Sequence, residues 1–212
     1  MWLHVDACHA GTAAMLPEHA TIFDGVQDAH SVVVNPHKWM FTPMDASVLF
    51  CRRMDTLRAS LALTPDYLET REAGAVHNLM DTGIALGRRF RALKLWMVMR
   101  VFGAEGLRAR LREHIRLAHE FARWVEADAN FELMAPVALS LVCFRAAPRG
   151  IAEPARDKLN EELLERVNAT GQTYLSHTRL RGHYVLRLAV GHIRTAESHL
   201  AHTWSLLRGA LR

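Results

Sequence analysis

The sequence contains little cysteine and has no long hydrophobic run. Its 212 residues include three cysteines, which are too few and too scattered for a disulfide framework. No apolar run approaches the roughly 20 residues that a membrane-spanning helix needs. Residues 1–6 lack the basic and apolar segments of a signal peptide. We therefore expect a globular protein of the reducing cytoplasm with no membrane segment.

The sequence also lacks the motifs of nucleic-acid-binding and metal-binding proteins. The net charge is +4 and the pI is near 9.3, but acidic residues are interleaved with the arginines and no aromatic-studded basic stripe appears. The thirteen histidines and three cysteines indicate no plausible metal site. We therefore predict neither a nucleic-acid partner nor a bound metal.

Two short strand-like runs are each followed by a reactive side chain. Residues 2–5 lead to Asp6, and the valines at 32–34 lead through Asn35 and a proline to a histidine and Lys38. A lysine held by a rigid turn at the end of a strand is a candidate for covalent amine chemistry. If the strands are neighbours, Asp6 and Lys38 open on one crevice, as a pyridoxal phosphate (PLP) site requires. Composition alone favours the alternative of a surface lysine and a turn-capping aspartate.

Apolar periodicity predicts an α/β protein with two parts. We expect a third strand at 46–51, a long loop at 63–87 that could cover an active site, and two helices separated by a stop at Gly103. The later elements are predicted as strands at 131–134 and 139–145, a helix around 159–167, strands at 173–176 and 184–190, and a helix at 195–211. Because the chain enters a strand almost at once, it looks like the back half of a longer protein.

Motifs along the whole chain resemble the group II PLP-dependent amino acid decarboxylases, particularly their aromatic members. The motifs are His4-Val5-Asp6-Ala7 with Gly11, Asn35-Pro36-His37-Lys38-Trp39, and Leu86-Gly87-Arg88-Arg89-Phe90-Arg91-Ala92-Leu93-Lys94-Leu95-Trp96. This resemblance covers essentially all 212 residues in order. It implies the fold type I architecture of PLP-dependent transferases. Residues 1–103 would be the C-terminal part of the large PLP-binding domain, and residues 104–212 the small C-terminal α/β domain.

The resemblance also implies roles for particular residues. Lys38 would form an imine with PLP, and Asp6 would pair with the protonated pyridine nitrogen. Asn35 and His37 match positions near the phosphate and the mouth of the active site, and His37 is a candidate catalytic residue. Cys8 falls where the family usually has a small alanine against the cofactor ring. An amino acid substrate and a homodimer that builds the site from both subunits are implied as well.

Two departures from the family leave alternatives open. The family's earlier half, which carries the ring-stacking residue and most phosphate donors, is not in this sequence, so we expect poor PLP binding unless another polypeptide supplies it. The family's loop tyrosine, which protonates the carbanion after CO2 loss, would fall near Leu79, and no tyrosine lies between Tyr67 and Gly87. His77 is the nearest proton-transfer group. A decarboxylase, an aldehyde synthase acting by oxidative deamination, and a non-catalytic dimerising remnant all remain open.

Three other residues in apolar strand runs have simpler interpretations. Cys51 and Cys143 are predicted to be buried and inert. Arg187 is unusual inside an apolar strand and could bind a substrate carboxylate, but a structural ion pair with a buried acid is the favoured interpretation.

Overall fold

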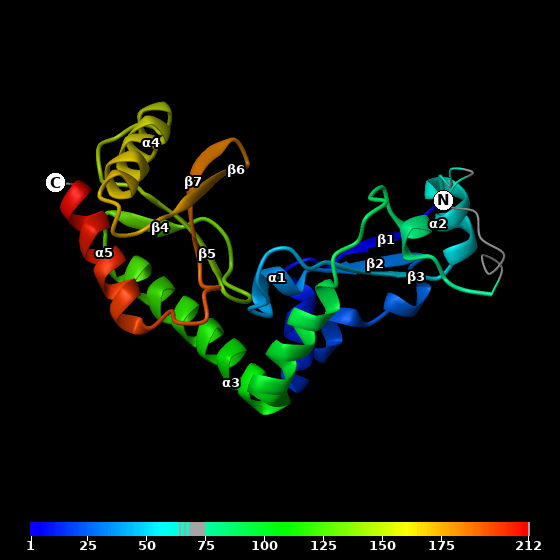
Figure 1. The fold of residues 1–212 in the computed structure, drawn as a ribbon. Coiled ribbons are helices and arrows are strands. Elements are labelled where there is room, and N and C mark those ends of the chain that lie inside the picture. Colours follow the sequence, from blue (N-terminus) through cyan, green and yellow to red (C-terminus); the bar gives the residue numbers. More distant parts are fainter. Residues whose placement is uncertain (64, 66, 68–74, 212) are drawn as a thin grey trace. The chain divides into compact units, whose positions relative to one another are not determined.

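The computed structural model describes residues 1–63, 65, 67 and 75–211. The chain divides into two compact units, Met1–Ala104 and Glu105–Arg212, which are described separately (Figure 1). The predicted loop at 63–87 lies partly outside the described residues. Its described part includes a 3-10 helix, Leu79–Thr82.

The first unit is built on a three-stranded sheet in the order β1-β2-β3 (Figure 1). The strands are β1 (His4–Asp6), β2 (Ser31–Val34) and β3 (Val48–Cys51). β1 runs parallel to β2, with Asp6 opposite Val33, and β3 runs antiparallel to β2. The three strands were expected, and the sheet is only partly covered, because Phe50 in β3 is 60% exposed. Its β-branched valines favour extended backbone even where one face stays open.

Short helical segments surround this sheet. Three 3-10 helices connect β1 to β2: Ala10–Met15, Pro17–Phe23 and Val26–Asp28. Helix α1 (Pro36–Trp39) follows β2 directly, with its proline at the first helical position, where no backbone N–H is needed. Helix α2 (Met54–Leu61) follows β3 and was not predicted, because its eight residues include too few apolar positions for a periodic signal.

Helix α3 (Arg91–Ala127) is interrupted at Gly103, where φ is 62° and ψ is 176°. Positive φ is readily accessible to glycine, so the predicted stop at this residue is confirmed as a break in the helix. In the segment before the break, several large apolar side chains are exposed. They are Leu93, Trp96, Met97, Met99 and Val101. In the segment after the break, an apolar stripe is buried, including Leu107, Leu111, Ala118 and Val125.

The second unit has a four-stranded antiparallel sheet in the order β4-β5-β7-β6. Its elements are β4 (Phe131–Leu133), β5 (Leu141–Ala146), α4 (Glu153–Ala169), β6 (Ser176–Leu180), β7 (His183–Ala189) and α5 (Glu197–Leu211). The core centres on Phe121, whose ring centroid lies 5.3 Å from that of Phe144 and 5.5 Å from that of Trp204. β6 begins later than predicted because the Asn168 amide bonds both the N–H and the C=O of Leu175, at 2.9 Å each.

The buried ion pair of the second unit forms at Arg145 rather than at Arg187. The Arg145 side chain is 6% exposed, and it bonds Glu132 at 2.6 Å and Glu153 at 2.8 Å. Among the described residues Arg187 makes no ion pair, and it lies opposite Cys143 in the β5–β7 ladder. The ion pair expected at Arg187 is therefore wrong. Cys51 and Cys143 are half-buried rather than buried.

Candidate functional site

Asp6 and Lys38 follow the same ends of two adjacent parallel strands. Asp6 is the last residue of β1, and Lys38 lies in α1, which begins two residues after β2 ends (Figure 1). Residues after the carboxyl ends of neighbouring parallel strands share one edge of the sheet. The positive charge of Lys38 contributes to the lowered pKa of Asp6, so the two side chains are within electrostatic reach. The structure thus brings together the two residues on which the sequence argument depended.

The Asp6 carboxylate is held by Cys8. Oδ1 of Asp6 accepts the backbone N–H of Cys8 at 3.0 Å. Hydrogen bonds from the thiol and from this N–H lower the pKa of Asp6, so that it is ionised at neutral pH. Burial, and then the neighbouring Asp6, raise the pKa of the Cys8 thiol. Cys8 is therefore a protonated donor at neutral pH and orients the carboxylate.

Backbone hydrogen bonds continue the β1–β2 pairing into the loops beyond the strands. The N–H of Ala7 donates to Val33 at 3.0 Å, and the N–H of Asn35 donates to Cys8 at 3.1 Å. The N–H of Lys38 donates in turn to the carbonyl of Asn35 at 2.9 Å. These bonds hold the segment that carries Lys38 against the segment that carries Asp6.

A stacked aromatic pair connects the loop after β1 with the segment after β2, and it was not predicted from the sequence. The rings of His9 and Trp39 lie nearly parallel, with an interplanar angle of 9° and centroids 4.9 Å apart. Trp39 is fully buried. Because His9 adjoins Cys8 and Trp39 adjoins Lys38, this stacking contact holds the two loops together. The signal available in the sequence was that each of these aromatic residues adjoins a predicted site residue.

Asn35 and His37 are oriented by residues that follow α1. Nδ1 of His37 accepts the backbone N–H of Ala46 at 3.1 Å. The hydroxyl of Ser47 donates to Oδ1 of Asn35 at 2.6 Å. Of the predicted site residues, Asp6, Cys8, Asn35 and Lys38 are linked by these contacts, and His37 lies beside Lys38 in α1.

The groups present match the functional groups of PLP. That molecule offers an aldehyde, a pyridine nitrogen and a phosphate, which call for an amine, a carboxylate and hydrogen-bond donors respectively. Lys38 supplies the amine and ionised Asp6 the carboxylate, and Asn35 and His37 retain N–H donors. The donor set of this edge of the sheet therefore fits the group.

The predicted proton donor His77 has another partner. Its Nδ1 lies 2.9 Å from Arg58 of α2, on the surface. In the described part of the chain, no other side-chain hydrogen bond of His77 is found. Leu79, at the position expected for a loop tyrosine, is 66% exposed.

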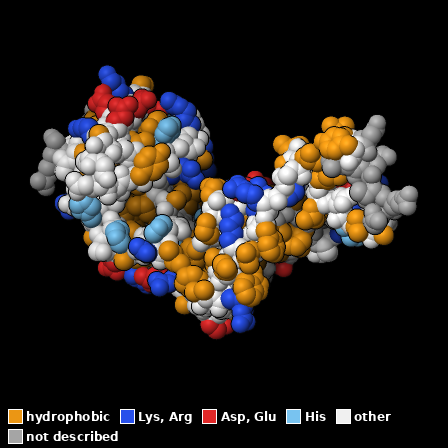
Figure 2. Space-filling view, viewed as in Figure 1, with side chains coloured by type: hydrophobic (Ala, Val, Ile, Leu, Met, Phe, Trp, Pro, Cys, Tyr) orange, Lys and Arg blue, Asp and Glu red, His pale blue; other side chains and the backbone are white. Residues whose placement is uncertain are grey.

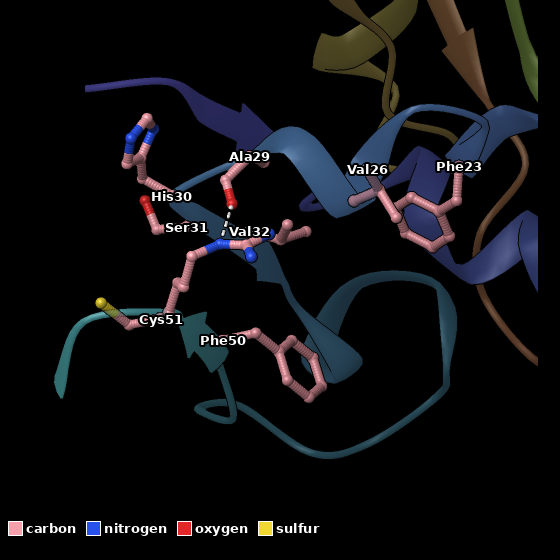
Figure 3. Close-up of a pocket in the computed structure, with 9 residues that line it drawn as sticks. Phe23, Val26, Ala29, His30, Ser31, Val32, Phe50 and Cys51 are labelled. Carbon is pink, nitrogen blue, oxygen red and sulfur yellow. Dashed lines mark hydrogen bonds between the residues drawn. The ribbon is translucent and has the colours of Figure 1, made fainter. Parts of the chain in front are cut away.

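A largely apolar hollow of the first unit lies at the opposite ends of the strands (Figure 3). It has a volume of about 500 Å³. Ser31, which begins β2, and Cys51, which ends the antiparallel β3, are among its lining residues, as are Phe23 and Phe50. The site of Asp6 and Lys38 is at the other edge of the sheet, so this hollow is distinct from it.

Comparison with known proteins defines the class. Residues 1–147 match the pyridoxal-dependent decarboxylase conserved domain, and the chain belongs to this family of PLP-dependent lyases. The chain is 42% identical over 210 residues to phenylacetaldehyde synthase of Arabidopsis thaliana, and 42% identical over 210 residues to tyrosine decarboxylase 2 of Narcissus pseudonarcissus. Each alignment covers 98% of this chain, and 43% and 42% of the respective relatives.

The fold agrees with that of solved members. The crystal structure of Oryza sativa TDC with PLP and tryptamine superposes with a TM-score of 0.90 at 39% identity, covering 99% of this chain and 44% of that one. The α/β fold of type I PLP-dependent transferases is thereby confirmed. The chain spans under half the length of these relatives. The roles of Lys38, Asp6, Cys8, Asn35 and His37 stay predictions.

No described helix combines the length and hydrophobicity required to span a bilayer. The described histidine, cysteine and acidic side chains form no group of three or more that could hold a metal ion.

Proposed function

We propose that this chain is the lysine-bearing part of an enzyme that decarboxylates an aromatic L-amino acid with PLP, releasing CO2 and an amine. The observation that carries the proposal is the placement of Asp6 and Lys38 beyond adjacent parallel strands, within electrostatic reach of each other. Family membership supports the cofactor. The tyrosine and tryptophan decarboxylases among the relatives support an aromatic substrate.

Each residue has a task that follows from its surroundings. PLP, when bound, supplies an electron-withdrawing ring that takes up the negative charge left by departing CO2. Nζ of Lys38 would hold the group covalently. Asp6, kept ionised and oriented by Cys8, would hold a proton on the ring nitrogen. Asn35 and His37 would donate N–H groups to the phosphate or to the substrate, with His37 beside the reacting lysine.

The proposal is tested by adding the amino-terminal part of a relative, which this chain does not contain. The chain is combined with the amino-terminal part of the Narcissus tyrosine decarboxylase, PLP, and carboxyl-labelled tyrosine, phenylalanine or tryptophan. We expect labelled CO2, lost in Lys38→Ala and retained in Lys94→Ala. Reassembly of the relative's own two parts is the positive control. If that control is active and this chain releases no CO2, the chain is the non-catalytic remnant instead.

A second reaction is favoured by Leu79. The absence of a tyrosine from its neighbourhood removes the expected proton donor, and phenylacetaldehyde synthase is among the relatives. The same site would then decarboxylate and oxidatively deaminate the substrate to an aldehyde. Dioxygen would be reduced to hydrogen peroxide, water would supply the aldehyde oxygen, and the amino group would leave as ammonia. Peroxide and aldehyde in the assay support this reaction, and amine alone excludes it. Leu79→Tyr is expected to shift the product from aldehyde to amine.

The arrangement of the complete enzyme is also part of the proposal. We infer that residues 1–103 belong to the C-terminal part of the large PLP-binding domain and residues 104–212 form the small domain. The exposed apolar side chains of the first unit, among them Phe50, Phe90 and Trp96, support a homodimer that covers them (Figure 2). Three free cysteines support a cytoplasmic location.

A further inference from the structure

Three consecutive residues after α1, Asp45-Ala46-Ser47, each bond a different neighbour. Both oxygens of Asp45 accept guanidinium N–H groups, from Arg89 at 2.8 Å and from Arg91 at 3.0 Å. Ala46 is buried and bonds His37 twice. Its N–H donates to Nδ1 of His37 at 3.1 Å, and its carbonyl accepts the His37 backbone N–H at 3.3 Å. The hydroxyl of Ser47 donates to Oδ1 of Asn35 at 2.6 Å.

These bonds occupy Nδ1 of His37 and Oδ1 of Asn35, which are acceptor atoms, and leave the N–H donors of both side chains available. A neutral imidazole has one acceptor nitrogen and one N–H, so a bond received at Nδ1 places the proton on Nε2. An amide whose oxygen is bonded likewise presents its NH2 group. In the described part of the chain, neither Nε2 of His37 nor Nδ2 of Asn35 forms a hydrogen bond. Two donors therefore remain beside Lys38, which suits an anionic group.

The negative charge of Asp45 is neutralised by its ion pairs with Arg89 and Arg91. Asp45 directly precedes the residue that bonds His37, and a free carboxylate there would oppose an anion. The Arg91 hydrogen bond is the largest cause of the lowered pKa of Asp45, and the charges of Arg91 and Arg89 lower it further, so the carboxylate stays paired. The same bonds fix residue 45 relative to the start of α3.

We propose that Asp45-Ala46-Ser47 is a positioning segment that makes Asn35 and His37 selective for the phosphate of PLP. Arg89 and Arg91 anchor it through Asp45. The segment touches neither cofactor nor substrate, and acts by taking the acceptor atoms of the two residues that do. This inference rests on the proposed function, because it assumes that PLP is the ligand of Lys38.

The test compares PLP with pyridoxal, which has the same aldehyde and no phosphate. The full chain is incubated with either compound, reduced with borohydride, and the modification of Lys38 is measured by peptide mass spectrometry. Losing a charge-assisted hydrogen bond to phosphate costs about tenfold in affinity. We therefore expect the preference of Lys38 for PLP over pyridoxal to fall about tenfold in Asp45→Ala and Ser47→Ala, with pyridoxal labelling unchanged. Asp55→Ala and Ser60→Ala, both on α2, are the matched controls and should keep the preference.

A second measurement separates failure of this inference from failure of the proposed function. The scalar coupling across the Ala46 N–H to His37 Nδ1 hydrogen bond is measured by NMR on the chain without any ligand. We expect the coupling in the wild type and in Asp55→Ala, and its loss in Asp45→Ala. An unchanged PLP preference or an unchanged coupling in Asp45→Ala overturns the positioning role. If wild-type Lys38 shows no preference for PLP, the proposed function fails, while the coupling still decides whether the segment holds His37.

Discussion

Replacement of Trp39 by alanine tests whether packing beneath the loops holds Lys38 in place. Trp39 is fully buried and stacks on His9, so its removal leaves a cavity below the segment that joins β2 to α1. Truncation of a buried tryptophan to alanine costs about 3–5 kcal/mol. At 1.4 kcal/mol for each factor of ten, opening of β2 becomes about a hundredfold to a few thousandfold more frequent.

Hydrogen exchange followed by mass spectrometry measures this opening directly. Peptides that contain β2 and the Lys38 amide should exchange faster by that factor, while peptides of the second unit keep their rates. Trp39→Phe retains an aromatic ring against His9 and should show a smaller acceleration. If β2 of Trp39→Ala exchanges hydrogen at the wild-type rate, or if both units are accelerated equally, this side chain does not support the site.

Three further predictions concern charged groups. Arg145→Ala removes a buried ion pair and should lower the free energy of unfolding of the second unit by about 2 kcal/mol in urea titrations. The loss is limited to this size because the partly exposed glutamate partners regain water. Arg149→Ala should have no effect. Burial, reinforced by a nearby arginine, lowers the pKa of His114 from 6.5 to about 4. The unfolded chain therefore binds the proton more readily than the folded chain does. About 3 kcal/mol of stability is present above pH 6.5 and is lost as the pH falls to 4. His114→Gln should remove this dependence of the free energy of unfolding on pH. Asp6→Asn should lower the pKa of the Cys8 thiol and speed its alkylation at neutral pH, and an unchanged rate would contradict the contact between the two groups.

The sequence predicted the end of β2 and the break in α3 well because their signals are local. Three valines followed by Asn35 and a proline specify where β2 stops, and Gly103 marks the break in α3. Asp6 and Lys38 each follow such a local pattern, but the residues alone favoured a surface lysine and a turn aspartate, and only the family resemblance singled the pair out. Whether the first two strands are neighbours was left open by the sequence, and the structure shows that β1 pairs with β2 in parallel.

Contacts between distant residues were not predictable. The late start of β6 depends on a side chain of α4 that bonds the backbone of Leu175. The choice of Arg145 over Arg187 as the ion-paired arginine depends on where Glu132 and Glu153 lie in the folded unit. No spacing in the sequence encodes either partner, because both belong to tertiary structure.

Identification of the modified lysine tests the central claim most directly. The chain has only three lysines, Lys38, Lys94 and Lys158, so each serves as a control for the others. After incubation with PLP and reduction with borohydride, tryptic peptides are quantified over a range of PLP concentrations. The account predicts that Lys38 is modified at lower PLP concentration than the other two, and that Asp6→Ala weakens this preference. Equal modification of all three lysines would contradict the assignment of Lys38 as the residue that binds PLP.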